Sequence, residues 1–426
     1  MRFAPFLAVA LAAAPLAAQA PRLTLAQVYA RLGTHNPRLA IAAARSDAAR
    51  ARIGPAGRWP DPSVQFQLMN RDLPGFGLND PLGMNQIQLM QMVPIAGKRG
   101  LARKAASAEA RAEDASTRET GFEVRTEAAM SFYDLYAAQH SLAVMTDSRR
   151  LLTDLGGAAE AMYTEGRGPQ ADVLRAQVEL SRMDEEIIGM EAMRERMEAR
   201  LAAMLLLSAD SLPDPVLPMV PAELPPRDSL VQLALEHRPM FEAGRARVSA
   251  ADATAQRASR EIWPDLTLGA VYGQRPMDDG TGRMLSLMFG FTLPITARSN
   301  QKQMAVEARA MAAMVTADLA EMEVDTRARI GELHAEFARA RRLAELYRTT
   351  LLPQAEASAA SAEAGYRNGV GPFMSLLEAR MTALRVSIDL IGADAATGRA
   401  LAELEMLTGT TLVDPASTAP DIGDLP

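Results

Sequence analysis

Four short segments of the chain alternate between apolar and polar positions, which is typical of β-strands with one apolar face. They form two pairs, 63–70 with 84–93 and 266–273 with 284–293. Turn-forming residues separate the members of each pair, and 274–282 is predicted to be the loop of the second pair. The pattern therefore predicts two β-hairpins. Their apolar face is predicted to carry Val64, Phe66, Leu68, Ile87, Leu89, Leu285, Leu287, Phe289 and Phe291.

The rest of the chain has the patterning of helices. After each hairpin a helix of roughly 65–70 residues is predicted, over 98–163 and again over 300–366. At 1.5 Å per residue each would be about 100 Å long, which is more than a single globular core requires. Pro353 interrupts the second long helix and is expected to kink it. Shorter helices are predicted at about 169–207 and 372–408.

The same order of elements occurs twice, about 200 residues apart. In each half a helical stretch is followed by a hairpin, a long helix and a shorter helix. Four landmarks recur in one order at offsets of 200 to 204 residues, so we predict a duplicated unit. The landmarks are Asn36-Pro37 with Arg238-Pro239, Trp59-Pro60-Asp61 with Trp263-Pro264-Asp265, Val93-Pro94-Ile95 with Leu293-Pro294-Ile295, and Tyr163 to Pro169 with Tyr366 to Pro372.

The repeat defines the domain boundaries. A basic Arg2, an apolar run and Ala18-Gln19-Ala20 predict a secretory signal peptide over 1–20, so the mature chain would begin at Pro21. The last residues are rich in Pro, Ser, Thr and Asp, as disordered tails are. The predicted divisions are a first repeat at 21–212, a Pro-rich linker at 213–226, a second repeat at 227–410 and a disordered tail at 411–426.

Composition excludes several classes of function. The chain has no cysteine, which removes disulfides, thiolate metal sites and a lipid-anchored cysteine. Its formal net charge of −7 comes from well-mixed residues without a basic cluster, which argues against nucleic acid as a partner. None of the 4 histidines has metal-ligand spacing, and no nucleophile elbow or phosphate loop is present. We therefore expect neither an enzyme nor a cofactor.

The predicted strands have no partner for their apolar face, because the long helices leave them and travel about 100 Å away. An outward apolar face with a polar or small-residue inner face is the pattern of a transmembrane β-barrel. Such barrels need at least 8 strands, and one chain supplies four, so the barrel would be shared between chains. Strand physics alone permits a dimer or a trimer. The alternative is a soluble β-sandwich edge docked on helices.

Specific motifs add a family resemblance. They are Trp59-Pro60-Asp61-Pro62, the run from Pro94 to Arg99, and the run from Gly166 to Ala176, which recurs loosely from Gly369 to Ala379. From about residue 23 to 412 the chain resembles the outer-membrane efflux proteins of the TolC-like family. The resemblance implies a homotrimer with a shared 12-stranded outer-membrane barrel and a long periplasmic helical barrel. It also implies a passive exit duct that meets a periplasmic adaptor and an inner-membrane pump of the resistance-nodulation-division type.

The helical hairpin tips are the predicted site of contact with the adaptor. Glycines there would let another backbone approach closely. The resemblance places a periplasmic gate just beyond the tips, although Ser375 stands where the best-known pattern has an aspartate, and Gly371 where it has a basic residue. Acidic residues at these positions also suit a helix N-terminus. The predicted tip residues are Gly166, Gly168, Pro169, Gly369, Gly371 and Pro372, and the predicted gate residues are Asp172, Tyr366, Ser375 and Glu378.

Methionines on the inner strand face bear on the cargo. Thioethers are soft ligands that suit Cu(I) or Ag(I), and they also suit adaptable packing or lumen lining without a metal. The resemblance extends to the branch paired with heavy-metal pumps, so metal cations are the expected cargo, with drugs or secreted polypeptides as alternatives. A periplasm-spanning coiled-coil protein without transport is an alternative of another class. The candidate ligands are Met69, Met84, Met90, Met92, Met284 and Met288.

Overall fold

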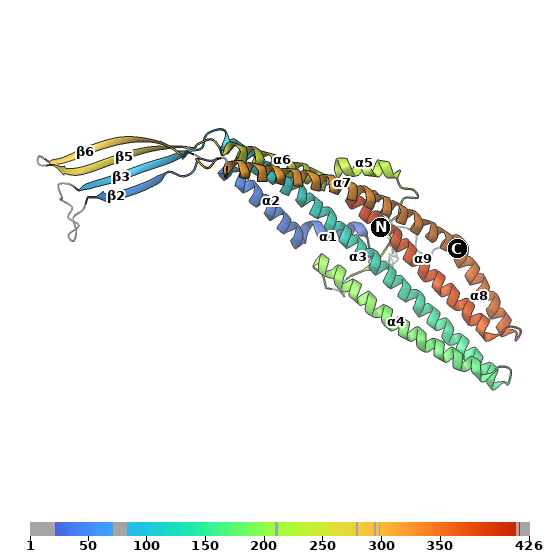
Figure 1. The fold of residues 1–426 in the computed structure, drawn as a ribbon. Coiled ribbons are helices and arrows are strands. Elements are labelled where there is room, and N and C mark those ends of the chain that lie inside the picture. Colours follow the sequence, from blue (N-terminus) through green and yellow to red (C-terminus); the bar gives the residue numbers. More distant parts are fainter. Residues whose placement is uncertain are drawn as a thin grey trace, which may run out of the picture.

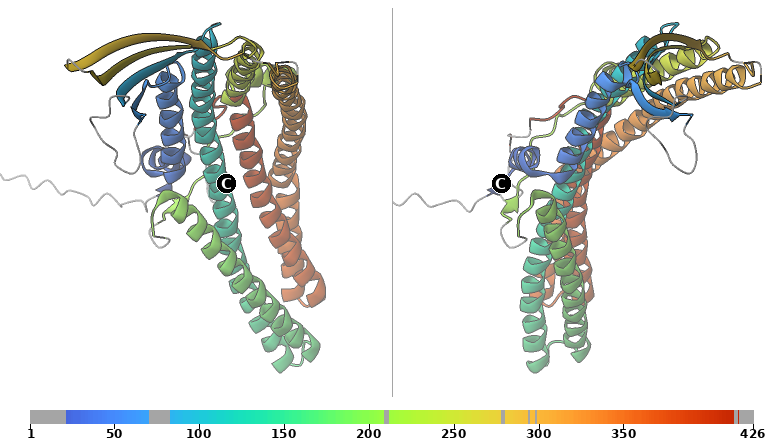
Figure 2. Two further views of the ribbon diagram at one scale, coloured as in Figure 1. Left: turned by 60° about the vertical axis from the view of Figure 1, so that its left-hand side comes forward. Right: turned by 90° about the vertical axis from the view of Figure 1, so that its left-hand side faces the viewer.

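The computed structural model describes residues 22–70, 83–208, 212–277, 280–293, 295–297, 299–414 and 417. The molecule is elongated, with a β-sheet at one end and the tips of two helical hairpins at the other (Figure 1). The hairpins α3–α4 and α8–α9 run side by side toward the same end (Figure 2). The predicted signal peptide lies outside the described residues.

The first half of the chain begins with a capped helix. Thr24 Oγ1 accepts a hydrogen bond from the backbone N–H of Gln27, whose side chain accepts one from the N–H of Thr24. Asn36 then ends α1, and its side chain caps α2, so the chain restarts a helix at Pro37. The elements of this half are α1 (Leu25–His35), α2 (Pro37–Ala56), β2 (Ser63–Met69), β3 (Met84–Val93), α3 (Lys98–Thr164) and α4 (Gln170–Leu205).

The second half repeats this order of elements. A short parallel pair of strands, β1 (Arg22–Leu23) and β4 (Asp214–Pro215), ties the start of the first half to the connection between the halves. The elements of the second half are α5 (Arg227–His237), α6 (Pro239–Arg260), β5 (Leu266–Met277), β6 (Gly280–Phe291), α7 (Gln301–Leu346), a π-helical turn (Tyr347–Leu351), α8 (Leu352–Arg367) and α9 (Phe373–Thr408).

The main sheet has the strand order β2-β3-β5-β6, and all neighbours are antiparallel. The prediction that 274–282 is a loop is wrong, because β5 continues to Met277 and β6 begins at Gly280. Pairing of β5 with β3 ends at Gln274, so Pro276 has a strand neighbour on only one side. A proline without an N–H to donate is tolerated at such an edge.

The long helices have the predicted extent. α3 contains 67 residues, which corresponds to about 100 Å. In the second half the helix is divided: a π-helical turn over Tyr347–Leu351 separates α7 from α8, just before Pro353. Proline cannot donate the helical hydrogen bond and its ring crowds the preceding turn, so the backbone widens there. The predicted interruption at Pro353 is confirmed.

Helix packing forms the core. Around Phe132 and Tyr133 of α3, helices α1, α4 and α9 meet, and Gly398 leaves space for the Tyr133 ring, which a β-carbon would approach to 2.2 Å. Among the described residues no helix combines the length and the apolar character needed to cross a membrane. The chain stays packed past the predicted start of the tail, since Glu405 accepts hydrogen bonds from the N–H groups of Leu412 and Val413. Residues 415–416 and 418–426 of that tail lie outside the described ranges.

Candidate functional site

The apolar face of the sheet is uncovered in the single chain. Phe66 on β2 is 79% exposed and Phe289 on β6 is 80% exposed, and both strands lie at the edges of the sheet. The register places Phe66 opposite Ile87 and Phe289 opposite Leu268, so these side chains share one face. The prediction of an apolar strand face that the helices of the chain do not cover is confirmed.

Glutamine and methionine gather on the other face. Gln65 pairs with Gln88 across β2 and β3, and Gln88 is buried. Gly269 lies between Met90 and Met288, and a β-carbon on Gly269 would lie 3.4 Å from the Met288 side chain. The register puts all the predicted methionines on this face: Met69, Met84, Met90, Met92, Met284 and Met288. In the described part of the chain, His, Asp and Glu form no group of three or more that could hold a metal ion.

A buried lysine joins the sheet to the helices. Lys98 Nζ lies 2.9 Å from Asp265 Oδ1, 2.9 Å from the carbonyl oxygen of Trp263 and 3.1 Å from Glu261 Oε2. Burial alone would lower the pKa of Lys98, but hydrogen bonds to Asp265 and Glu261 raise it above its ordinary value. The contact holds the start of α3 against the Trp-Pro-Asp corner of the second half. Sequence reasoning singled out both motifs without finding that they meet.

The two tips have the same backbone geometry. Gly166 and Gly369 have φ of 71° and 73°, as the residue after a helix C-cap often does. In each tip the N–H two residues past the C-cap reaches back to the last helical turn, from Arg167 to Met162 O at 2.8 Å and from Val370 to Gly365 O at 3.0 Å. Both glycines therefore end helices as predicted.

The remaining predicted tip residues lie in the same turns. By sequence, Pro169 and Pro372 suit the first position of a helix, but in the structure they are the N-caps, one residue before the first helical residue. Gly371 packs on the preceding helix, where a β-carbon would lie 3.3 Å from the backbone of Gly365. Gly168 packs in the same way on Met162, at 3.2 Å. A side chain at either position would require the neighbouring atoms to shift by a few tenths of an ångström.

Of the predicted gate residues, Asp172 lies near enough to Tyr366 for its charge to act on the tyrosine hydroxyl. Tyr366 is buried against Phe373, with ring centroids 5.3 Å apart, and its hydroxyl has no hydrogen-bond partner among the described residues. Burial raises the pKa of Tyr366, and the negative charge of Asp172 raises it further. Ser375 and Glu378 lie exposed on the first turns of α9. The apolar cluster around Tyr366 also contains Leu152, Leu155, Ala159, Ala176, Leu376 and Leu377, and it joins the two helical hairpins.

With this geometry in place, comparison with known proteins identifies the family. The family model described as "Outer membrane efflux protein" matches residues 28–205 and 230–410. The chain belongs to the outer membrane efflux protein family. The members of this family are passive channels, so the protein is a channel and not an enzyme. The two matched segments coincide with the two halves that share one order of elements.

Solved structures of outer-membrane channels share the fold. The channel OprN has a TM-score of 0.78 at 20% identity, covering 91% of this chain and 90% of that one. VceC from Vibrio cholerae has a TM-score of 0.78 at 18% identity, covering 91% and 96%. CusC has a TM-score of 0.78 at 12% identity, covering 92% and 93%. No curated protein matches the sequence.

Proposed function

We propose that the protein is the outer-membrane exit duct of a tripartite efflux system. In this proposal three copies form a homotrimer whose 12 strands close one barrel, embedded in outer-membrane lipid, with the helices extending into the periplasm. The observation that supports it most is the exposed apolar face of a sheet with two free edge strands, β2 and β6. An edge strand exposes unpaired backbone groups, and closing a barrel removes both edges.

The two tips are the proposed contact with a periplasmic adaptor and, through it, with an inner-membrane pump. Leu174 and Val178 of α4 are exposed beside Leu377 of α9, close to both tips, and line a shallow groove. Opening would require the hairpins to separate at the cluster around Tyr366. We expect the second hairpin to move and the first to hold. Equal displacement of both tips in an open state would contradict this expectation.

Conductance in planar lipid bilayers tests the duct. The purified protein should form discrete channels, and a substitution that opens the Tyr366 cluster should raise the open probability. A protein that forms neither an oligomer nor a channel would exclude the proposal. The alternative is a periplasmic spacer without transport, which predicts that removing both β-hairpins leaves function intact.

We propose heavy-metal cations as the cargo. Six methionines on the inner strand face support this proposal, because thioethers are soft ligands. A deletion strain should become sensitive to Cu, Ag, Co, Zn or Cd ions and stay resistant to dyes and detergents. Sensitivity to dyes and detergents alone would favour drug efflux, and loss of a secreted polypeptide would favour a protein-secretion duct.

A further inference from the structure

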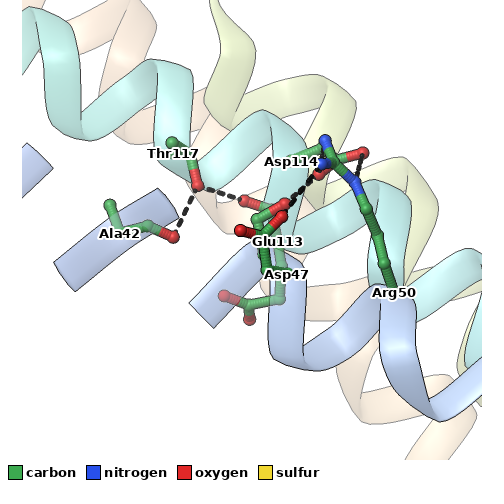
Figure 3. Close-up of polar contacts among 7 residues, drawn as sticks. Ala42, Asp47, Arg50, Glu113, Asp114 and Thr117 are labelled. Carbon is green, nitrogen blue, oxygen red and sulfur yellow. Dashed lines mark hydrogen bonds and ion pairs between the residues drawn. The ribbon is translucent and has the colours of Figure 1, made fainter. Parts of the chain in front are cut away.

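Two helix contacts occur at matching positions in the two halves. Thr117 Oγ1 of α3 donates a hydrogen bond to the carbonyl oxygen of Ala42 in α2, at 3.0 Å (Figure 3). Leu319 of α7 packs closely on Gly244 of α6, where a β-carbon would lie 2.7 Å from Leu319 Cδ1. The two contacts match, because Gly244 lies 202 residues after Ala42 and Leu319 lies 202 residues after Thr117. Thus α2 lies on α3 as α6 lies on α7.

Around Ser116, α3 packs against α2 on one side and against α6 on another. The side of α7 that matches the α6-facing side of α3 is exposed. Besides α2, this part of α3 packs against α6, and six alanines of these two helices are buried: Ala108, Ala112 and Ala115 of α3, and Ala246, Ala250 and Ala253 of α6. The positions equivalent to the three α3 alanines, 202 residues later, are Ala310, Met314 and Ala317 of α7. The positions equivalent to the three α6 alanines, 202 residues earlier, are Ala44, Ala48 and Ala51 of α2. All six of these residues are exposed. The contact between α3 and α6 therefore buries the surfaces whose counterparts on α7 and α2 are free.

Charges on the two free surfaces are complementary. Between α3 and α6, Arg247 Nη2 donates a hydrogen bond to Ser116 Oγ at 3.0 Å. The position equivalent to Arg247 is Arg45 on α2, and the position equivalent to Ser116 is Asp318 on α7. Both are exposed, and neither makes an ion pair with another described residue of the chain. A guanidinium and a carboxylate at this position would form a stronger contact than the internal pair does.

The pairing of β3 with β5 inside the chain also predicts how the edge strands β2 and β6 of two copies would pair. Val64 pairs with Leu89, and Leu268 pairs with Phe289, so the two hairpins have equivalent registers, with shifts of 204 residues for β2 to β5 and 200 for β3 to β6. Between the hairpins, Leu89 pairs with Ala270. Applying the shifts to that pair places Phe289 of one edge opposite Phe66 of the other. Both phenylalanines are exposed on the apolar face.

We propose that a second copy of this chain docks its α2 on the free face of α7, in the way α6 docks on α3. Arg45 of one copy then pairs with Asp318 of the next, and Phe66 of β2 stands opposite Phe289 of the neighbouring β6. The inference rests on the channel assembly proposed above and specifies the register of its interface. Charge complementarity and the internal copy of the same interface identify the occupant as a second copy of the chain.

Cysteine cross-linking tests the strand register, and the natural chain has no cysteine to interfere. F66C combined with F289C should give a covalent ladder of oligomers under oxidising conditions, because directly paired strand residues lie within disulfide reach. Within one chain β2 and β6 are separated by two strands, about 14 Å, so the bond must join two copies. The matched control is F66C combined with L285C. Residue 285 lies four positions from residue 289 on β6, so this double variant should give no ladder. A ladder from the control alone would overturn the proposed register.

Charge reversal tests the helical contact. R45D and D318R should each lower the temperature at which the oligomer dissociates in detergent, and the double variant should recover most of the loss. The control is R327D, because Arg327 lies nine residues from Asp318 and so on the opposite side of α7. A double variant no more stable than either single variant would overturn the pair. Channels without the F66C–F289C ladder would refute the interface alone, and a ladder without channels would refute the duct alone.

Discussion

The two helical tips have nearly the same backbone and opposite surroundings. Both turn at a glycine with positive φ and both begin the next helix after a proline. Tyr163 at the first tip is 45% exposed, whereas the matching Tyr366 is 5% exposed. The next helix supplies the difference, because Phe373 follows the second proline where Gln170 follows the first. Glycine and proline thus determine the turn, and one apolar side chain determines which tip is anchored in the core between the hairpins.

Removing Phe373 should break this contrast most strongly. Phe373 is 2% exposed, and truncating a buried phenylalanine to alanine costs about 3–5 kcal/mol. F373A should therefore raise amide hydrogen exchange throughout the Tyr366 cluster, including α3 and α4. The matched variant Q170A removes an exposed side chain and should change stability by less than about 0.5 kcal/mol. Equal effects of the two variants would show that the tips are anchored alike.

A similar contrast holds for ion pairs at the two ends of α3. Lys98 is buried between two carboxylates, whereas Arg167 at the first tip pairs with Glu165 in an exposed position. K98M leaves Asp265 and Glu261 without their cation and should destabilise the protein by about 1–3 kcal/mol. R167A should cost less than about 1 kcal/mol. Thermal unfolding of both variants beside the parent measures the difference.

The pKa of Lys98 fixes the pH dependence of that effect. Because the folded pKa is raised above 10.5, the stability that the lysine contributes is complete below this pH and is lost only as pH rises through the folded value. The destabilisation of K98M should therefore be equal at pH 6 and pH 9. A penalty that shrinks between these values would mean that Lys98 is not held by its two carboxylates.

Much of this arrangement could be predicted from the sequence. Period-two alternation located both hairpins, and the Gly-x-Gly-Pro runs located both tips, because these signals are local. The contact of Lys98 with Asp265 was not predicted, since it depends on β3 pairing with β5 and so on residues 167 positions apart. The extent of β5 was also missed, because backbone pairing continues through Arg275 and Pro276 whatever their side chains. Local patterns specify the helices and strands, whereas strand pairing between the halves specifies the contact of Lys98 with Asp265.

The turns themselves should respond alike in the two tips. An alanine in the left-handed region costs roughly 1–2 kcal/mol. At both Gly166 and Gly369 an added β-carbon would meet no described atom within 4 Å, so backbone strain is the whole cost. G166A and G369A should therefore destabilise their tips by about the same amount, measured as local hydrogen exchange. A much larger loss at Gly369 would mean that the turn, and not only Phe373, distinguishes the second tip.

The smallest expected effect is that of Tyr366→Phe. The Tyr366 hydroxyl is buried and has no hydrogen-bond partner among the described residues, so the folded protein gains nothing to offset its lost hydration. Removing it keeps the ring packing with Phe373 and should leave stability unchanged or raise it by up to about 1 kcal/mol. Thermal unfolding measures this, with Y163F at the exposed tip as the control. A loss of stability in Y366F alone would show that the hydroxyl has a partner in the assembled channel, and the second tip would then be held by a polar contact between copies as well as by its apolar cluster.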